Sequence, residues 1–169
     1  LEGGDGQELL QSSSGHRSSQ SVSTSCSNDG TIQKSGLISA SETWCGTIQI
    51  ADNVVIAGHS IVTVGPGSRI EFNIDGKEIK VSGGGKIILN GTPGQRITVA
   101  TTAGVVPGKF DLAYYVPGME ARYVDFSRIG NNITPSIVTR PKVSTWSNSV
   151  FILEESTFDN CGRIEVGLY

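Results

Sequence analysis

The chain has 169 residues, of which 22 are glycine and only 17% are charged. The formal net charge of −3 excludes an extended basic surface for nucleic acid, because such a surface needs clustered lysine and arginine. No apolar run reaches the roughly 18 residues of a membrane-spanning helix. The many Ile, Val, Thr and Ser residues in the middle of the chain predict an all-β protein.

Residues 1–30 differ in composition from the rest of the chain. They are rich in Ser, Gly and Gln and hold too few apolar side chains to offset the entropy lost on ordering. We therefore expect a tail or linker at 1–30, of a kind that also carries O-glycans, followed by one β domain at 31–169. No signal-like segment follows Leu1, so we expect either a removed leader or an internal piece of a longer protein.

The three cysteines are Cys26, Cys45 and Cys161. The first two are close enough in sequence to form a disulfide that pins the N-terminal segment to the first strands, and the alternative is three free or buried thiols. We expect Cys161 to be a small buried filler. There is no Cys-x-x-Cys pair, and His16 and His59 lack Cys, Asp or Glu neighbours at ligand spacing. We therefore expect no metal site and no cofactor.

From residue 31 onward the sequence predicts short strands. Each is four or five residues long and is bounded by Gly, Pro, Asn or Asp, which favour turns. The clearest runs are 47–50, 61–64, 69–72, 78–81, 86–89 and 96–99.

Two architectures fit this spacing. One is an antiparallel β-sandwich. The other is a three-faced solenoid of parallel strands with about five coils of roughly 25 residues each. The turns are longer than those of tight hairpins, and residues one coil apart are alike, such as Val64 and Leu89. We therefore favour the solenoid, with the sandwich as the alternative.

Several motifs resemble the opening coils of secreted and cell-surface proteins of the right-handed parallel β-helix family, which share a pectate-lyase-like scaffold. They are the Trp-Cys-Gly entry at 44–46, the Gly-Pro-Gly turn at 65–67 and the Gly-Thr-Pro turn at 91–93. The resemblance covers 43–102 well and 120–163 more loosely, and it departs at Gln95-Arg96, where the family often has a second proline. It implies a right-handed parallel β-helix and specifies no activity.

Two segments, 104–118 and 130–146, are expected to leave the strands as loop excursions. Loops on a rigid scaffold often carry binding sites, and aromatic side chains stack on sugars. Tyr114, Tyr115 and Trp146 are therefore our candidates for contacts with a cell-surface polysaccharide, although single aromatic residues more often serve packing. The sequons at Asn90 and Asn132 are candidate glycosylation sites.

Catalysis by a glycoside hydrolase would require two carboxylates in one groove. Asp125 and Asp159 occur in similar sequence contexts and are weak candidates for such a pair. The alternative, which we favour, is that they lie on outward faces or in turns. The other acidic residues considered are Asp111, Glu120, Glu154 and Glu155. The sequence thus leans against an enzyme.

The function we expect is that of a non-catalytic, extracellular or cell-surface structural or adhesive module. The alternative is a fragment of a carbohydrate-active enzyme, such as a polysaccharide lyase or glycoside hydrolase, or a polysaccharide-binding module. The apolar segment 164–169 resembles a strand without a cap. We therefore expect a second copy as partner, in head-to-tail contacts that build a filament.

Overall fold

The computed structural model describes residue 26 and residues 30–113, 118–131, 135–140 and 150–166. These residues form strands and no helix. The strands are β1 (Thr31–Ile38), β2 (Glu42–Trp44), β3 (Thr47–Ile56), β4 (Ile61–Val64), β5 (Arg69–Phe72), β6 (Glu78–Val81), β7 (Lys86–Asn90), β8 (Ile97–Thr101), β9 (Lys109–Ala113), β10 (Gly118–Arg122), β11 (Val124–Ser127), β12 (Ile137–Arg140), β13 (Val150–Glu154), β14 (Thr157–Asp159) and β15 (Ile164–Val166).

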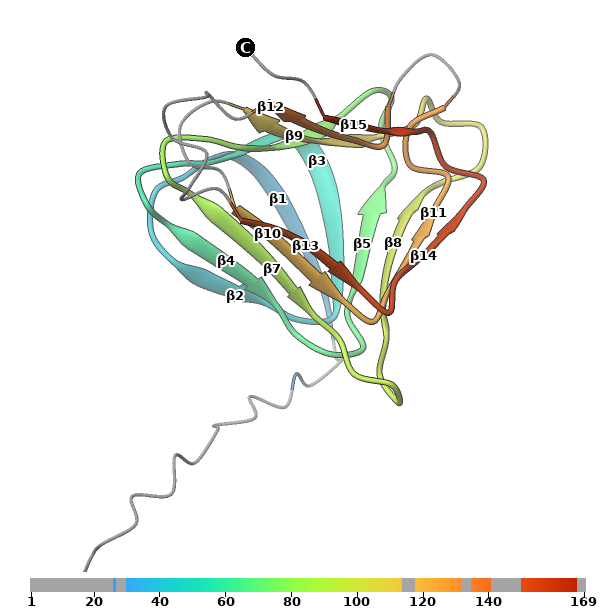
Figure 1. Ribbon diagram of the computed structural model, residues 1–169, viewed down its shortest axis with the longest axis horizontal. Coiled ribbons are helices and arrows are strands. Elements are labelled where there is room, and N and C mark those ends of the chain that lie inside the picture. The colour runs from blue at the N-terminus through green and yellow to red at the C-terminus, as the bar shows by residue number, and fades with distance from the viewer. Residues whose placement is uncertain (1–25, 27–29, 114–117, 132–134, 141–149, 167–169) are drawn as a thin grey trace, which may run out of the picture.

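The strands pair into two sheets that curl around a common interior like a half-barrel (Figure 1). The larger sheet has the order β14-β11-β8-β5-β3-β6-β9-β12-β15, with β1 also paired to β3. The smaller sheet has the order β13-β10-β7-β4-β2. All pairings between these named strands are parallel, which overturns the antiparallel sandwich.

The prediction of a three-faced β-helix is also wrong, because two of the expected faces are arms of one sheet. Strand β3 runs for ten residues without a break. Its first part pairs with β5 and its last part with β6, so it joins both arms. The polar pair in its middle does not form a corner: Asp52 accepts a hydrogen bond from Lys77 at 2.9 Å, and Asn53 accepts one from the amide of Glu78 at 3.1 Å. These bonds satisfy the polar side chains while the backbone stays extended.

Alternation of apolar and polar residues gives each strand one face toward the interior. On β4 to β7 the second and fourth residues are buried and the residues between them are partly exposed. Because the parallel strands pair in register, side chains of the same kind stack on one another. One such series carries apolar side chains across five strands: Ile48, Ile70, Val99, Phe126 and Phe158.

Aromatic rings form a continuous column in this core. Phe72 and Phe110 lie edge to face at a centroid distance of 6.1 Å, and Phe110 meets Phe126 in the same way at 6.2 Å. Phe126 stacks face to face on Phe158 at 4.6 Å. The first three rings are fully buried, whereas Phe158, on the last strand of its arm, is not.

The two segments predicted to be loop excursions, 104–118 and 130–146, each contain a strand of the larger sheet. Strand β9 lies in the first segment and β12 lies in the second, and the two strands pair with each other. The sequence on either side of these strands holds Pro and Gly, which predict loops, yet the short runs between these residues alternate well enough to extend the sheet.

A disulfide joins Cys26 to Cys45, with the two Cα atoms 5.2 Å apart, as predicted. It fixes the chain ahead of β1, and the amide of Thr47 donates a hydrogen bond to the carbonyl of Gly30 at 3.0 Å. Gly65 lies directly beneath the bridge, where a Cβ atom would overlap Sγ of Cys26. Apart from Cys26 and Gly30, the predicted tail lies outside the described residues.

Candidate functional site

The two weak catalytic candidates lie on neighbouring paired strands. Asp125 on β11 pairs in register with Thr157, and Ser127 pairs with Asp159 on β14. Asp125 alternates with the buried Phe126 and so faces away from the core, as Asp159 does beside Phe158. The two carboxylates therefore share an outer face but are two register positions apart.

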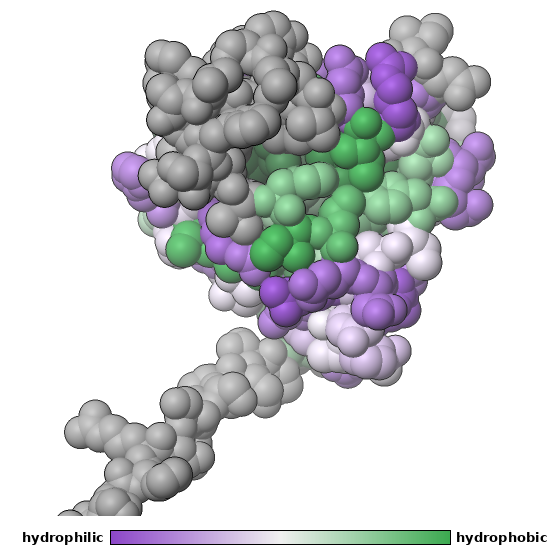
Figure 2. All heavy atoms as spheres, viewed as in Figure 1, coloured by the Kyte–Doolittle hydropathy of each residue, from purple (hydrophilic) through white to green (hydrophobic). Residues whose placement is uncertain are grey.

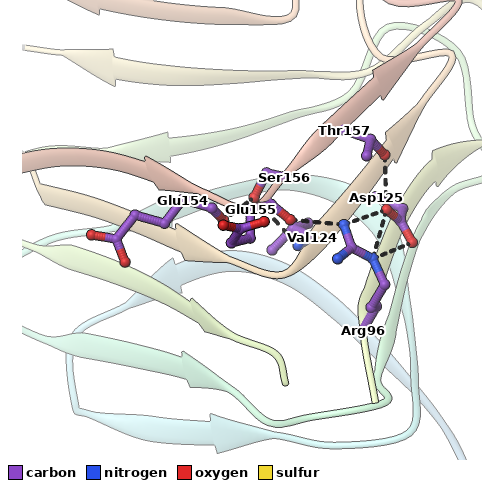
Figure 3. A network of polar contacts seen from close by, with 7 residues as sticks. All are labelled: Arg96, Val124, Asp125, Glu154, Glu155, Ser156 and Thr157. Carbon is purple, nitrogen blue, oxygen red and sulfur yellow. Dashed lines mark hydrogen bonds and ion pairs between the residues drawn. The ribbon is translucent and has the colours of Figure 1, made fainter. Parts of the chain in front are cut away.

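Asp125 is held in a network of polar contacts (Figure 3). Nε of Arg96 donates to both of its carboxylate oxygens at 2.9 Å, and a terminal guanidinium nitrogen donates to one of them at 2.7 Å. The hydroxyl of Thr157 donates to the same carboxylate at 2.8 Å. Arg96 also donates to the carbonyl of Glu155 at 2.8 Å, so one side chain connects β11 to the turn between β13 and β14.

This network determines the protonation of Asp125. Hydrogen bonds from Arg96 lower its pKa below the ordinary value, partial burial opposes the shift, and the Thr157 hydroxyl and the Arg96 charge reinforce it. Asp125 in turn raises the pKa of Arg96. A carboxylate held ionised in this way is a poor general acid, because a general acid needs a raised pKa. The environment of Asp125 is that of a structural ion pair.

Other carboxylates on the sheet surfaces are also paired with basic residues. Glu120 on β10 pairs with Lys86 on β7, and Glu154 on β13 pairs with Arg122 on β10 at 3.2 Å. Asp111 differs: it is 8% exposed, and its Oδ1 has no hydrogen-bond partner within the described part of the chain. The described residues hold no group of three or more His, Cys, Asp or Glu side chains that could hold a metal ion.

Cys161 is free, half-buried and packed against the core, where the sequence predicted a small buried filler. Its Sγ–H donates to the carbonyl of Asp159 at 3.3 Å. Burial raises the pKa of its thiol, although backbone hydrogen bonds act in the opposite direction. A thiol with a raised pKa carries little thiolate, so it is a poor nucleophile.

The predicted sugar-binding residues cannot be placed. Tyr114, Tyr115 and Trp146 lie outside the described residues, and so does the sequon residue Asn132. Asn90 is exposed at the end of β7.

A second polar cluster, which we name the closed end, consists of Lys34, Glu42 and Trp44 at the start of the sheets. Lys34 pairs in register with Ile50, and Glu42 pairs with Val62. Both partners are fully buried, so the two charged residues occupy core-facing positions. Their ion pair is 2.9 Å long, and Nε1 of Trp44 donates to Glu42 at 2.7 Å.

The electrostatics of the closed end favour the ionised carboxylate. Partial burial raises the pKa of Glu42, but hydrogen bonds from Trp44 and Lys34 outweigh it and leave the pKa below the ordinary value. The Lys34 ammonium also lies 5.4 Å from the centre of the Trp44 ring, within cation–π range. The sequence signal for this cluster was a lysine two residues after Ile32, at a position where the alternation of β1 calls for an apolar side chain.

The opposite end of the sheets, which we name the open end, consists of Phe151, Leu153, Phe158 and Ile164. These residues lie on β13, β14 and β15, the last strand of the smaller sheet and of each arm of the larger one. Figure 2 shows hydrophobic side chains gathered on this face, toward the viewer. Phe158 and Ile164 are 37% and 38% exposed, which is unusual for residues at core-facing positions.

The chain matches no protein-family model, no curated protein and no solved structure. The resemblance of 43–102 to secreted and surface proteins therefore rests on sequence motifs alone. No helix in the described part of the chain is long and apolar enough to cross a membrane.

Proposed function

We propose that this chain is a non-catalytic structural or adhesive module that works outside the cell. The observation that carries the proposal is that Arg96 binds the carboxylate of Asp125. The carboxylate best placed for catalysis is engaged by three hydrogen bonds from one guanidinium and one from Thr157. Each bond favours the charged form and fixes the side chain against the sheet.

The remaining outward charges also support a structural role. Glu78 on β6 pairs with Lys109 on β9 at 3.2 Å, and Arg122 on β10 pairs with Glu154 on β13 at 3.2 Å. In both cases the paired residues are register partners on adjacent strands. Opposite charges at such positions stabilise strand pairing by about 0.2–1 kcal/mol per pair.

The Cys26–Cys45 disulfide is compatible with an extracellular location, because structural disulfides persist in oxidising compartments. It closes a loop across 19 positions of the sequence and joins the segment before β1 to the end of β2.

The experiment that tests the proposal is a cleavage assay on a panel of neutral and acidic polysaccharides, read as new reducing ends and as unsaturated products. We expect no cleavage by the purified chain. Asp125→Asn and the matched control Asp52→Asn would be assayed in parallel, since Asp52 is an exposed ion-paired carboxylate far along the sheet from Asp125. Cleavage that Asp125→Asn abolishes and Asp52→Asn retains, with both variants folded by circular dichroism, would overturn the proposal.

A further inference from the structure

The pair Asn90-Gly91 lies where β7 ends and the chain turns toward β8. Asn90 is the last residue of β7 and is exposed, whereas Gly91 is buried. It is the only Asn-Gly pair in the sequence. An asparagine followed by glycine readily loses its side-chain amide, because glycine has no side chain to hinder attack by its own backbone nitrogen. The reactivity of this pair therefore depends on how the fold holds the nitrogen of Gly91.

The fold requires glycine at position 91. A Cβ atom there would lie 2.5 Å from the carbonyl oxygen of Tyr123 and 2.9 Å from that of Arg122. Both oxygens belong to the backbone where β10 passes into β11, so they cannot turn aside as a flexible side chain would. A larger residue at 91 would have to shift this corner of the sheets. The close packing of backbone on backbone thus keeps a reactive dipeptide in the chain.

The same contact protects Asn90. The amide of Gly91 donates a hydrogen bond to the carbonyl of Arg122 at 3.0 Å, so the attacking nitrogen is both bonded and buried. Asn90 is the register partner of Arg122 on β10. On the other side of β7 the pairing with β4 stops at Leu89. The protection of Asn90 therefore depends on the pairing of β7 with β10 alone.

We propose that Asn90 is a deamidation site whose rate is set by local opening of the β7–β10 pairing. When the pairing opens, the nitrogen of Gly91 loses its hydrogen bond and attacks Cγ of Asn90. A C–N bond forms, the bond from Cγ to Nδ2 breaks, and the side-chain nitrogen leaves as ammonia while the nitrogen of Gly91 gives up its proton. Water then opens the cyclic imide at either carbonyl, which yields aspartate or isoaspartate. The net reaction converts one amide and one water into one carboxylate and one ammonium ion.

Both products change this corner of the sheets. Aspartate at 90 places a carboxylate beside Arg122, which already pairs with Glu154. Isoaspartate directs the main chain through the side-chain carbon, so the backbone gains an atom directly ahead of the bond from Gly91 to Arg122. Loss of the side-chain nitrogen also removes the acceptor for an N-linked glycan, so deamidation and glycosylation are alternatives at Asn90. The proposal does not depend on whether the module is structural, adhesive or catalytic.

The test compares the rate of deamidation in the folded chain and in concentrated guanidinium chloride at one mildly alkaline pH. The full chain is produced in a host without N-glycosylation, and peptide mass spectrometry with chromatographic separation of the isoaspartyl form locates the product. We expect the folded chain to react at least about tenfold more slowly, because only the open fraction reacts. Equal rates in the two conditions, or a signal that persists in Asn90→Gln, would overturn the proposal.

A matched pair of variants tests whether the opening is local. Glu120 on β10 pairs with Lys86 on β7, so Glu120→Gln weakens the contact between these two strands. We expect it to accelerate deamidation of the folded chain by about 1.5-fold to fivefold, the factor for one cross-strand charge pair, and to leave the rate in denaturant unchanged. The control Glu78→Gln removes the ion pair with Lys109 between β6 and β9 and should change neither rate. An acceleration by Glu120→Gln no larger than that by Glu78→Gln would overturn the proposal.

Discussion

Arg96 connects three segments of the chain on the outer face of one arm. It precedes β8, binds the carboxylate of Asp125 on β11 and donates to the carbonyl of Glu155, which has a positive φ of 47°. A non-glycine residue in that conformation is strained, and the hydrogen bond to its carbonyl helps to hold the turn. The guanidinium fork is what allows one side chain to bind both acceptors.

Replacement of this fork gives the first prediction. Arg96→Lys keeps the charge but loses the bidentate geometry, so we expect the variant to unfold at a lower urea concentration than the wild-type chain. The control is Arg69→Lys, because Arg69 makes one exposed ion pair, to Glu71. We expect that change to be close to neutral. Urea denaturation of both variants checks the difference, and equal losses would show that the fork has no special role.

The second prediction concerns Gly108. It is buried beside Phe72, and a Cβ atom at this position would overlap the phenyl ring. Phe72 is fully buried and packed edge to face on Phe110, so it cannot move freely. Gly108→Ala is therefore expected to cost about 1–3 kcal/mol of stability by overpacking. Gly94→Ala is the matched control, since no atom lies within 4 Å of its added Cβ, and its thermal midpoint should barely change.

The third prediction follows from the lowered pKa of Glu42. Its hydrogen bonds with Trp44 and Lys34 outweigh the effect of burial, so its pKa is lower in the folded chain than in the unfolded one. The resulting stabilisation is complete above the unfolded pKa of roughly 4.3 and is lost as the pH falls through the folded pKa. Lys34→Met should therefore destabilise the fold more at about pH 7 than at about pH 3.

Urea denaturation at the two pH values measures this difference. Lys80→Met serves as the control, because Lys80 is a half-buried lysine on β6 without an ion pair among the described residues. A penalty for Lys34→Met that does not vary with pH would contradict the assigned role of Glu42.

At the scale of elements, β1 and β2 depend on the disulfide next to them. The loop closed by Cys26 and Cys45 spans 19 positions, for which chain entropy predicts about 3 kcal/mol of stabilisation. Cys26→Ser is expected to lower stability by about that amount and to increase amide exchange first in β1. Cys161→Ser, which leaves the bridge intact, should cost less. Peptide mapping without reduction should recover Cys26 linked to Cys45, with Cys161 free.

The sequence predicted the strands better than their connections. Runs at 61–64, 69–72 and 78–81 coincide with β4, β5 and β6, because strict alternation between turn residues is a strong local signal. β3 was cut short at residue 50, since Asp52 and Asn53 resemble turn residues and the bonds that keep them extended come from the next strand. β9 and β12 were missed because Pro and Gly surround them.

The candidate site was predictable only in part, for the same reason. The similar contexts of Asp125 and Asp159 did place them on paired strands. The partner that decides the chemistry of Asp125 is Arg96, which lies 29 residues away in sequence. The sequence did not predict the ion pair of the closed end, because Lys34 and Glu42 lie on two different strands and meet only in the folded chain.

At the scale of the whole molecule, the sequence could not fix the number of sheets. Parallel pairing was expected from the recurrence of similar residues at intervals of about 25, and the pairings between strands are parallel. Whether three series of strands form three sheets or two depends on the middle of β3, where the strand continues without a corner. Hydrogen bonds from residues far along the sequence hold this part of β3 extended, and a local sequence pattern does not reveal them.

The parallel order predicts a gradient of local stability, which is our last prediction. Strands such as β5 and β7 pair on both sides and bury their inner faces fully, whereas β14 pairs on one side and its residues are exposed. Hydrogen exchange followed by mass spectrometry should therefore be slowest in β5 and β7 and fastest in β13, β14 and β15. Uniform protection across all strands would indicate that the chain opens as one unit.

The closed end has a further consequence for the way the chain is made. Synthesis releases the N-terminus first, so β1 and β2, which carry the Lys34–Glu42 pair, and Cys45 directly after them emerge before any strand that can rest on them. Each later strand of the three series then meets an edge that already exists and has the right direction. Translation and stacking therefore proceed in the same order. At each stage of synthesis, the strand made last has an unpaired edge to which the next strand of its series can add.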